Sequence, residues 1–499
     1  MKQTYILGIL AIYFCLLLLV SWWTNRQGGH TNKAFFTANK QSPWYIVAFG
    51  MIGATISGVT FVSVSGMALA KDMYYMQMCL GFAVGYYIVA YVLLPIYYKL
   101  KTPSIYSLIG QRIGSKAHST ASAYFLLSRM LGTAAKLYLV CMIIHSFLLP
   151  SIPFWGITIG AVTMVWIYTK NNGLQTVVWT DTLQTACVIA SMVWIIFGTI
   201  HQLHLSPSEA LETLISSPHF KIFEWNNWSS SQHFIKQFLS GIFIVIVMTG
   251  LDQDMMQKNL TCRTLPDAQK NMITYGYAFI PLNFLLLCLG IFLGHLVIAK
   301  GLSTPESTDQ LLPMIATQGG MGNVFMTLFA IGIIAAAFGN TDSALTSMTT
   351  CMYVDFIAKR KLSKSNTHLA LINPENTKRR KYIHLGLAII LALCILLFNV
   401  IQKDSVLDLI FKLASYTYGP ILGLFIYAIF SLGKNKYAVD NVDKYVVYFA
   451  LLSPLCTYII QYIVEKMTGY RFGYEGLLIN GGIMWGCLWI STLCSKKLI

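Results

Sequence analysis

Two aspartates stand inside long apolar stretches of the sequence, beside small polar residues. Asp181 follows a Trp-Thr pair, and Asp342 lies in the run GNTDS at residues 339–343. Hard cations prefer carboxylate, amide, hydroxyl and carbonyl oxygens, and an ionisable side chain at membrane depth marks an ion or substrate pathway. These residues therefore predict cation binding. The alternative is that the hydroxyls bond back to their own helix and that Asp181 caps a helix end at the interface.

Residues 50–60 place three glycines among small and hydroxyl side chains, again within an apolar stretch. An interruption in a spanning helix frees backbone carbonyls, which can bind a cation. Residues 247–250 form a weaker version of the same pattern. The alternative is close helix packing through small residues, which the pattern favours for the second segment taken alone.

Two basic residues, Arg129 and Lys136, lie seven positions apart and therefore share one helix face. They can attract an anionic solute, pair with a carboxylate, or extend toward lipid headgroups. Lys412 is interpreted as structural.

The elements that hold these residues are predicted to be membrane helices. Hydrophobic residues make up 56% of the 499-residue chain and charged residues 11%, whereas soluble domains carry about 25% charged residues. About thirteen segments have the roughly 20 apolar residues that a spanning helix needs. The predicted spans in the lipid bilayer are 4–23, 44–70, 75–98, 119–149, 153–169, 176–200, 236–254, 272–299, 323–351, 382–402, 405–432, 445–465 and 475–494.

Lysine and arginine gather in alternate connecting segments, which places these segments in the cytoplasm. The N-terminus is then outside and the C-terminus inside a plasma (inner) membrane. Topology accounts for the net charge of +16. The basic run at residues 359–381 is expected to face anionic lipid, with no nucleic acid as partner. No GxxxxGK[ST] loop is present, which argues against an ATP-driven pump.

The spans predict five parts of the chain. Two blocks of five helices each hold an odd number of spans, so they must have opposite topology, as in inverted-repeat transporters. The parts are a first helix with an inner loop (1–42), a first five-helix repeat (43–200), an extracellular loop (201–235), a second five-helix repeat (236–432) and two C-terminal helices (433–499).

The order and spacing of several motifs resemble the sodium:solute symporter family over nearly the whole chain. The motifs are residues 35–36 with 42–44, residues 55–61, residues 173–175 with 178–181, residues 254–258, and the polar span that ends in Asp355-Phe356. The resemblance implies an all-α membrane protein with a leucine-transporter-like 5+5 inverted-repeat core, one helix before it and two after.

The resemblance also implies a main sodium site between the first and eighth core helices. Its carbonyl ligands correspond to Gly53, Ile56 and Ala336. Two further positions are usually serine, but here they are Gly339 and Asn340. Asn340 offers an amide oxygen, whereas Gly339 offers no side chain, so Thr341 or water would have to complete the site.

A second cation site is implied at Asp181, Asp342 and Ser343, where an aspartate replaces a usual serine. Two close carboxylates would either clamp a cation or share a proton, which leaves proton coupling open. For the solute, the sialic acid branch of the family implies Thr55, Ser57, Thr60, Tyr75 and Cys79. Its carboxylate-binding arginine falls near Gly132, and Arg129, one turn away, is the candidate substitute.

The prediction is therefore a sodium-coupled secondary active symporter that imports a small polar organic solute by alternating access. The solute would be a sugar, an acidic sugar such as sialic acid, or a carboxylate. Sodium is the coupling ion, no other cofactor is expected, and no catalytic constellation indicates an enzyme. The alternatives are a proton-coupled symporter of the same fold, a membrane-embedded solute sensor, a channel or a membrane-embedded enzyme.

Overall fold

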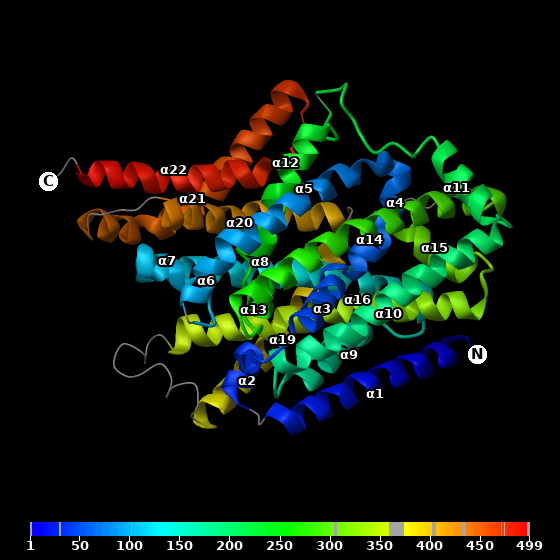
Figure 1. The fold of residues 1–499 in the computed structure, drawn as a ribbon, viewed down its shortest axis with the longest axis horizontal. Helices are drawn as coiled ribbons and strands as arrows, with labels where there is room; N and C mark the ends of the chain where they lie inside the picture. The colour runs from blue at the N-terminus through cyan, green and yellow to red at the C-terminus, as the bar shows by residue number, and fades with distance from the viewer. Residues whose placement is uncertain are drawn as a thin grey trace.

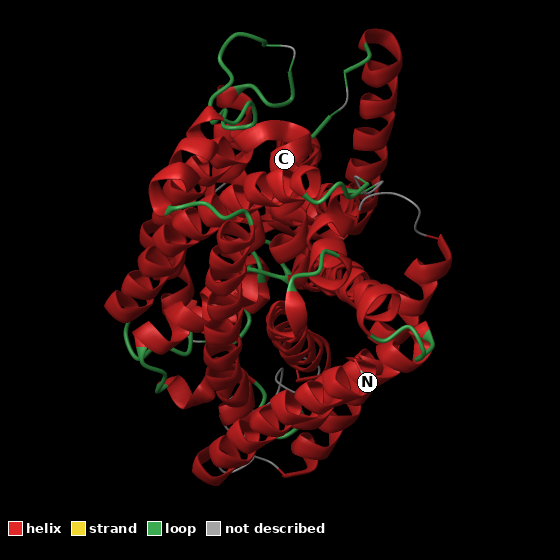
Figure 2. Ribbon diagram, turned by 90° about the vertical axis from the view of Figure 1, so that its right-hand side faces the viewer, coloured by secondary structure: helices red, strands yellow, loops and turns green. Residues whose placement is uncertain are grey.

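The structure, a computed structural model, is almost entirely helical (Figure 2). In the part of the chain that it describes, one isolated bridge joins Ser42 to Cys262. The described residues are 2–28, 31–100, 102–228, 230–303, 307–358, 374–401, 406–430, 436–470, 472–473 and 475–496. Most of the basic run predicted at 359–381, namely 359–373, lies outside them.

The helices follow one another with few long connections (Figure 1). The first half contains α1 (Lys2–Gly28), α2 (Asn32–Thr37), α3 (Trp44–Thr55), α4 (Gly58–Lys71), α5 (Tyr75–Ile88), α6 (Leu94–Leu100), α7 (Ser107–Arg112), α8 (Ser115–Ile143), α9 (Phe154–Thr169), α10 (Leu174–Gln202) and α11 (Pro207–Ser216). The second half contains α12 (Phe234–Val245), α13 (Gln253–Asn259), α14 (Leu265–Ala299), α15 (Leu311–Gln318), α16 (Gly322–Cys351), α19 (Pro374–Ile401), α20 (Val406–Phe430), α21 (Lys436–Thr468) and α22 (Glu475–Lys496).

Among the described residues, ten helical stretches are long and apolar enough to cross a membrane, or eleven if one bent pair is counted as a span. Two further apolar helices, α3 and α9, are shorter and are not included in this count. A multi-pass membrane protein is therefore confirmed. One of the ten stretches, Gly58–Leu100, combines two predicted spans and turns at Asp72, whose φ is 51°. The total of thirteen spans and the inverted repeat remain predictions.

The first predicted interruption is present between α3 and α4. Ile56 leaves the helical region with φ −72° and ψ 76°, and the Ser57 side chain then accepts a hydrogen bond from Thr60 N as the cap of α4. Gly53 lets α3 approach α10 closely, because its backbone N donates to Thr185 Oγ1 at 3.1 Å and a Cβ atom there would overlap that side chain. The glycines of this segment thus serve both the break and the packing beside it.

The second interruption is also real. After a π turn at Ile246–Gly250, the chain leaves the helix and resumes as α13, and the two parts are bent by 71°. Asp252 caps α13 by accepting hydrogen bonds from Asp254 N and Met255 N. The segment also packs closely, because a Cβ atom on Gly250 would lie 2.5 Å from Leu93 Cδ1, so the break and the small-residue packing occur together.

The polar segments gather in the middle of the molecule. α10 packs against both α3 and α16, and every residue of α16 from Gly332 to Cys351 is buried. In Figure 1, α1 runs along one side of the helix array and α22 along the opposite side. The short helix α15 lies in the connection between α14 and α16.

The contact between α5 and α12 gives a test of the packing. Gly81 lies against Phe238 O, and a side chain there would meet that carbonyl. We expect Gly81→Val to lower the melting temperature of the purified protein, because overpacking costs about 1–3 kcal/mol. Gly160→Val in α9 is the matched control, since a Cβ there meets nothing within 4 Å. Equal melting temperatures of the two variants would contradict this packing.

Candidate functional site

The end of α3 and the polar part of α16 lie side by side. Asn340 Nδ2 donates to the carbonyl of Ala54 at 3.1 Å, and Ala54 lies between the predicted ligands Gly53 and Ile56. α10 packs against both α3 and α16, and its residue Asp181 lies against Gly50 of α3. The two segments predicted to hold the main sodium site are therefore in direct contact.

Several oxygen atoms at this junction are buried and make no hydrogen bond with any described residue. They are Asn340 Oδ1, Asp181 Oδ1 and Gln184 Oε1. Buried polar atoms almost always have a partner, so a group of unpartnered oxygens is available to a bound cation. The structure places these side-chain oxygens beside the break between α3 and α4. Sequence analysis expected backbone carbonyls to be exposed at this break.

Gln184 occupies the space left by the missing serine at Gly339. A Cβ on Gly339 would lie 2.9 Å from Gln184 Oε1 and 3.5 Å from Asp181 Oδ1. Thr341, suggested as the replacement ligand, donates to Ala337 O at 2.8 Å within its own helix. The side-chain oxygen that faces the Gly339 position therefore comes from α10. Sequence analysis missed Gln184, although it lies three residues after Asp181 on the same helix.

Asp342 is surrounded by neutral donors. Its Oδ2 accepts from Tyr168 Oη at 2.8 Å and from Thr180 Oγ1 at 3.3 Å, and its Oδ1 accepts from Ser343 N at 2.6 Å. The residue is fully buried, and it forms no ion pair within the described part of the chain. Asp342 is thus a buried carboxylate that interacts with Lys258 at longer range but forms no direct ion pair with it.

Asp181 differs, because it has a basic partner. Lys258 Nζ lies 2.7 Å from Asp181 Oδ2, and both side chains are 1% exposed. Asp181 lies well inside α10, whose N-cap is Gly173, so the helix-capping alternative for this residue is wrong. Lys258 belongs to the 254–258 motif, but sequence analysis gave it no role. The sequence feature that could have identified Lys258 is its position just after the second helix break.

A second buried ion pair joins α8 to α13. Arg129 forms a direct ion pair with Asp254 and lies 3.9 Å from Asp252. Ser343 Oγ also donates to Asp254, and Tyr418 Oη donates to Asp252 at 2.5 Å. Of the three uses considered for Arg129, the structure shows pairing with a carboxylate. Ser343, expected beside the second cation, has its hydroxyl directed to Asp254.

The predicted solute residues lie on both sides of the first break. Thr55 Oγ1 is 2.8 Å from Tyr275 Oη of α14, and Ser57 Oγ is 3.2 Å from Thr60 Oγ1. On α5, Tyr75 is half-buried and Cys79 is a buried free thiol. The hydroxyls of this group thus follow the break closely, and Tyr275 joins them.

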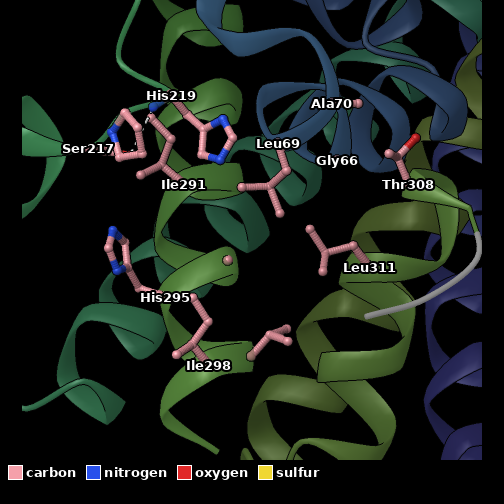
Figure 3. A pocket seen from close by; sticks show the side chains of 13 residues that line it. Gly66, Leu69, Ala70, Ser217, His219, Ile291, His295, Ile298, Thr308 and Leu311 are labelled. Carbon is pink, nitrogen blue, oxygen red and sulfur yellow. Dashed lines mark hydrogen bonds between the residues drawn. The ribbon is translucent and has the colours of Figure 1, made fainter. Parts of the chain in front are cut away.

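A cavity of about 390 Å³ lies at the other end of α4, between α4 and α14 (Figure 3). Its lining includes Leu69, His219, Ile291 and His295, and His219 Nδ1 is 2.9 Å from Asp72 Oδ1. None of the polar residues at the helix break lines this cavity. It is separate from the candidate site.

Comparison with known proteins places this arrangement in a family. The family model described as "Sodium:solute symporter family" matches residues 35–437. The chain belongs to the sodium:solute symporter family. The polar residues described above all fall within the matched region.

This symporter is similar to two curated bacterial relatives. The sodium/sialic acid symporter SiaT of Proteus mirabilis (strain HI4320) is 25% identical over 447 residues, which cover 86% of this chain and 85% of the relative. The sodium/glucose cotransporter of Vibrio parahaemolyticus is 23% identical over 382 residues, covering 70% and 69%.

A solved structure shares the fold of this symporter. It shows a substrate-bound, outward-open state of a Na⁺-coupled sialic acid symporter, with a TM-score of 0.81, 21% identity and 98% coverage of both chains. At this identity the likeness supports the fold alone.

A double-mutant cycle tests the Asp181–Lys258 pair. We expect Asp181→Asn and Lys258→Met each to destabilise the symporter by about 3–5 kcal/mol, because each leaves one buried charge without its partner. The double variant should melt closer to the wild type than either single variant, since it removes both charges. Thermal melting of the purified proteins measures this, with Lys412→Met on exposed α20 surface as control. If the losses of stability measured in the two single variants add up in the double variant, the proposed interaction between Asp181 and Lys258 is contradicted.

Proposed function

We propose that this family member is a sodium-coupled secondary active symporter. It imports a small polar organic solute, namely a sugar, an acidic sugar such as sialic acid, or a carboxylate, by alternating access. It lies in the plasma (inner) membrane with its N-terminus outside and its C-terminus in the cytoplasm. Support comes from the family and from relatives whose names specify sodium with sialic acid or glucose.

The observation that carries the proposal is the set of unpartnered oxygens at the junction of α3, α10 and α16. Asn340 Oδ1 and Gln184 Oε1 are buried without partners beside the unwound turn. Sodium, a hard cation, prefers such oxygen ligands. We place the main sodium site here, with the carbonyls of Gly53, Ile56 and Ala336. Gln184 takes the place of the side chain that Gly339 lacks.

We assign a second cation to Asp342. Asp181 forms a direct ion pair with Lys258, whereas Asp342 is hydrogen-bonded only to neutral donors and interacts with Lys258 at longer range. Two buried carboxylates that share one lysine keep a net negative charge, which is costly at membrane depth, so a bound cation would stabilise Asp342. In this proposal, Asp181 orients the site through Lys258, and Asp342 supplies the charge that the cation neutralises.

Coupling follows from the position of the break. Sodium at the end of α3 fixes the backbone from which Thr55 and Ser57 project, and Tyr275 already holds Thr55 from α14. Ordering these hydroxyls by sodium raises the affinity for the solute, and the solute raises the affinity for sodium by the same factor. The inside-negative potential then adds about 2.3 kcal/mol per charge per 100 mV to inward movement.

Gradient-driven uptake into proteoliposomes tests this function. With an inward sodium gradient, the wild type should accumulate at least one solute from a panel of labelled sugars, acidic sugars and carboxylates. We expect Asp342→Asn and Asn340→Ala each to reduce accumulation about tenfold or more, because a charge-assisted contact contributes about 1.5–3 kcal/mol. Replacing the sodium gradient with a pH gradient should abolish accumulation.

Asn480→Ala is the matched control. Asn480 Nδ2 donates to Ser415 O at 2.9 Å and its Oδ1 is buried without a partner, but it joins α22 to α20 away from the break. Solute accumulation by the Asn480→Ala variant should equal that of the wild type. Wild-type accumulation driven by a pH gradient, or unchanged in Asp342→Asn and Asn340→Ala, would contradict the sodium assignment.

A further inference from the structure

A groove of about 410 Å³ lies on the surface of the helix array, where α10 ends and α16 begins. Its lining comes from residues 194–202 in the last part of α10 and from residues 321–325 at the start of α16. It shares no residue with the cavity beside α4 or with the candidate cation site. The groove is therefore a feature that the proposed function does not use.

Most of the groove faces the hydrocarbon part of the membrane. Trp194 and Phe197 belong to the spanning stretch of α10 and are 59% and 67% exposed. Val324, near the start of the spanning stretch of α16, is 59% exposed. Buried Phe325 forms the floor, since a Cβ atom on Gly198 would lie 3.3 Å from Phe325 Cδ2. The groove thus offers an apolar surface on which a lipid chain can pack.

The polar end of the groove coincides with the end of α10. His201 and Gln202 are the last two residues of this helix, and they lie about 10–12 Å beyond Trp194 at a rise of 1.5 Å per residue. Tryptophan is enriched at the level where lipid chains meet headgroups. The order of apolar and polar side chains along the groove therefore matches that of a phospholipid.

Lys300, the residue that follows α14, places its ammonium group at this polar end. Its Nζ donates to Gly319 O at 2.5 Å and lies 3.4 Å from Gln202 Oε1 and 3.9 Å from Met321 Sδ. Gln202 and Met321 both line the groove. These contacts are with neutral atoms, and Lys300 forms no ion pair with any residue that the structure describes. Its charge is therefore available to an anion bound in the groove.

We propose that this groove binds one anionic phospholipid of the adjacent leaflet. An acyl chain packs on Trp194, Phe197 and Val324. The phosphate binds Lys300, and the exposed imidazole of His201 lies at the same end of the groove. Basic side chains at the ends of spanning helices attract anionic headgroups. A zwitterionic headgroup fits less well, because its own cation adds a second positive charge beside Lys300.

The lipid would hold together two helices that carry the candidate cation site. Gln184 lies on α10 and Asn340 on α16, and these two helices pack against each other. The bound lipid contacts both helices near their ends, away from these side chains. The inference goes beyond the proposed function and does not depend on it, because lipid binding at Lys300 requires neither sodium nor solute.

Native mass spectrometry of the purified symporter tests the inference by titration with phosphatidylglycerol or phosphatidylcholine of identical acyl chains. The wild type should bind its first phosphatidylglycerol about fivefold more tightly than phosphatidylcholine. Lys300→Gln should remove this preference and Lys300→Arg should keep it. Val324→Glu, which adds a carboxylate to the groove, should also remove it. Lys236→Gln is the matched control and should keep the preference, since Lys236 lies over the rings of Trp228 and Tyr470 outside the groove.

The melting temperature of each variant without added phosphatidylglycerol shows whether it is folded. If Lys300→Gln does not fold, Val324→Glu decides the question. Equal affinities of the wild type for the two lipids would overturn the inference, as would a preference that persists in a folded Lys300→Gln or is lost equally in Lys236→Gln. A wild-type dimer that Val324→Glu dissociates would also overturn it, because a second copy of the chain would then cover the groove.

Discussion

Charges buried at membrane depth must be compensated locally, and this constraint organises the centre of the symporter. Each uncompensated ion costs several kcal/mol of desolvation free energy. Two pairs, Arg129–Asp254 and Lys258–Asp181, meet the constraint within the protein. Both join α13, the segment after the second break, to helices elsewhere in the core. The segment after the second break is therefore held by electrostatic contacts in addition to hydrophobic packing.

We propose that a coupling cation binds beside the carboxylate that lies outside these pairs. Asp342 accepts hydrogen bonds from the neutral donors Tyr168 and Thr180 and forms no ion pair with any described residue. A protein that binds ions reversibly needs a charged side chain without a direct ion pair. A side chain that is already paired within the protein binds an added ion only weakly. The contrast between Asp181 and Asp342 illustrates this, since the two aspartates looked equivalent in the sequence.

The fold could be predicted from the sequence to a large extent. Span lengths and glycine content indicated a polytopic helical protein and a break near Gly53, because these depend on local composition. The second break was harder to recognise, since its bend of 71° follows a single glycine, Gly250, in an otherwise apolar segment. Its clearest physical cause is the Asp252 side chain, which caps the new helix.

The site was predictable only in outline. Sequence motifs identified Asp181, Asn340 and Asp342, but pairing between distant helices decides which of them is free. The lysine that pairs with Asp181 lies 77 residues away, and no local pattern specifies that contact. Gln184 was missed for a similar reason, because its role depends on the absent side chain at Gly339 on another helix.

Equilibrium binding of radioactive sodium to the purified symporter, in the absence of solute, tests the central claim most directly. We predict saturable sodium binding by the wild type and loss of at least one bound sodium in Asp342→Asn, with Asn480→Ala unchanged. Equal sodium binding by the wild type and Asp342→Asn would contradict the claim that the unpaired carboxylate holds a coupling ion.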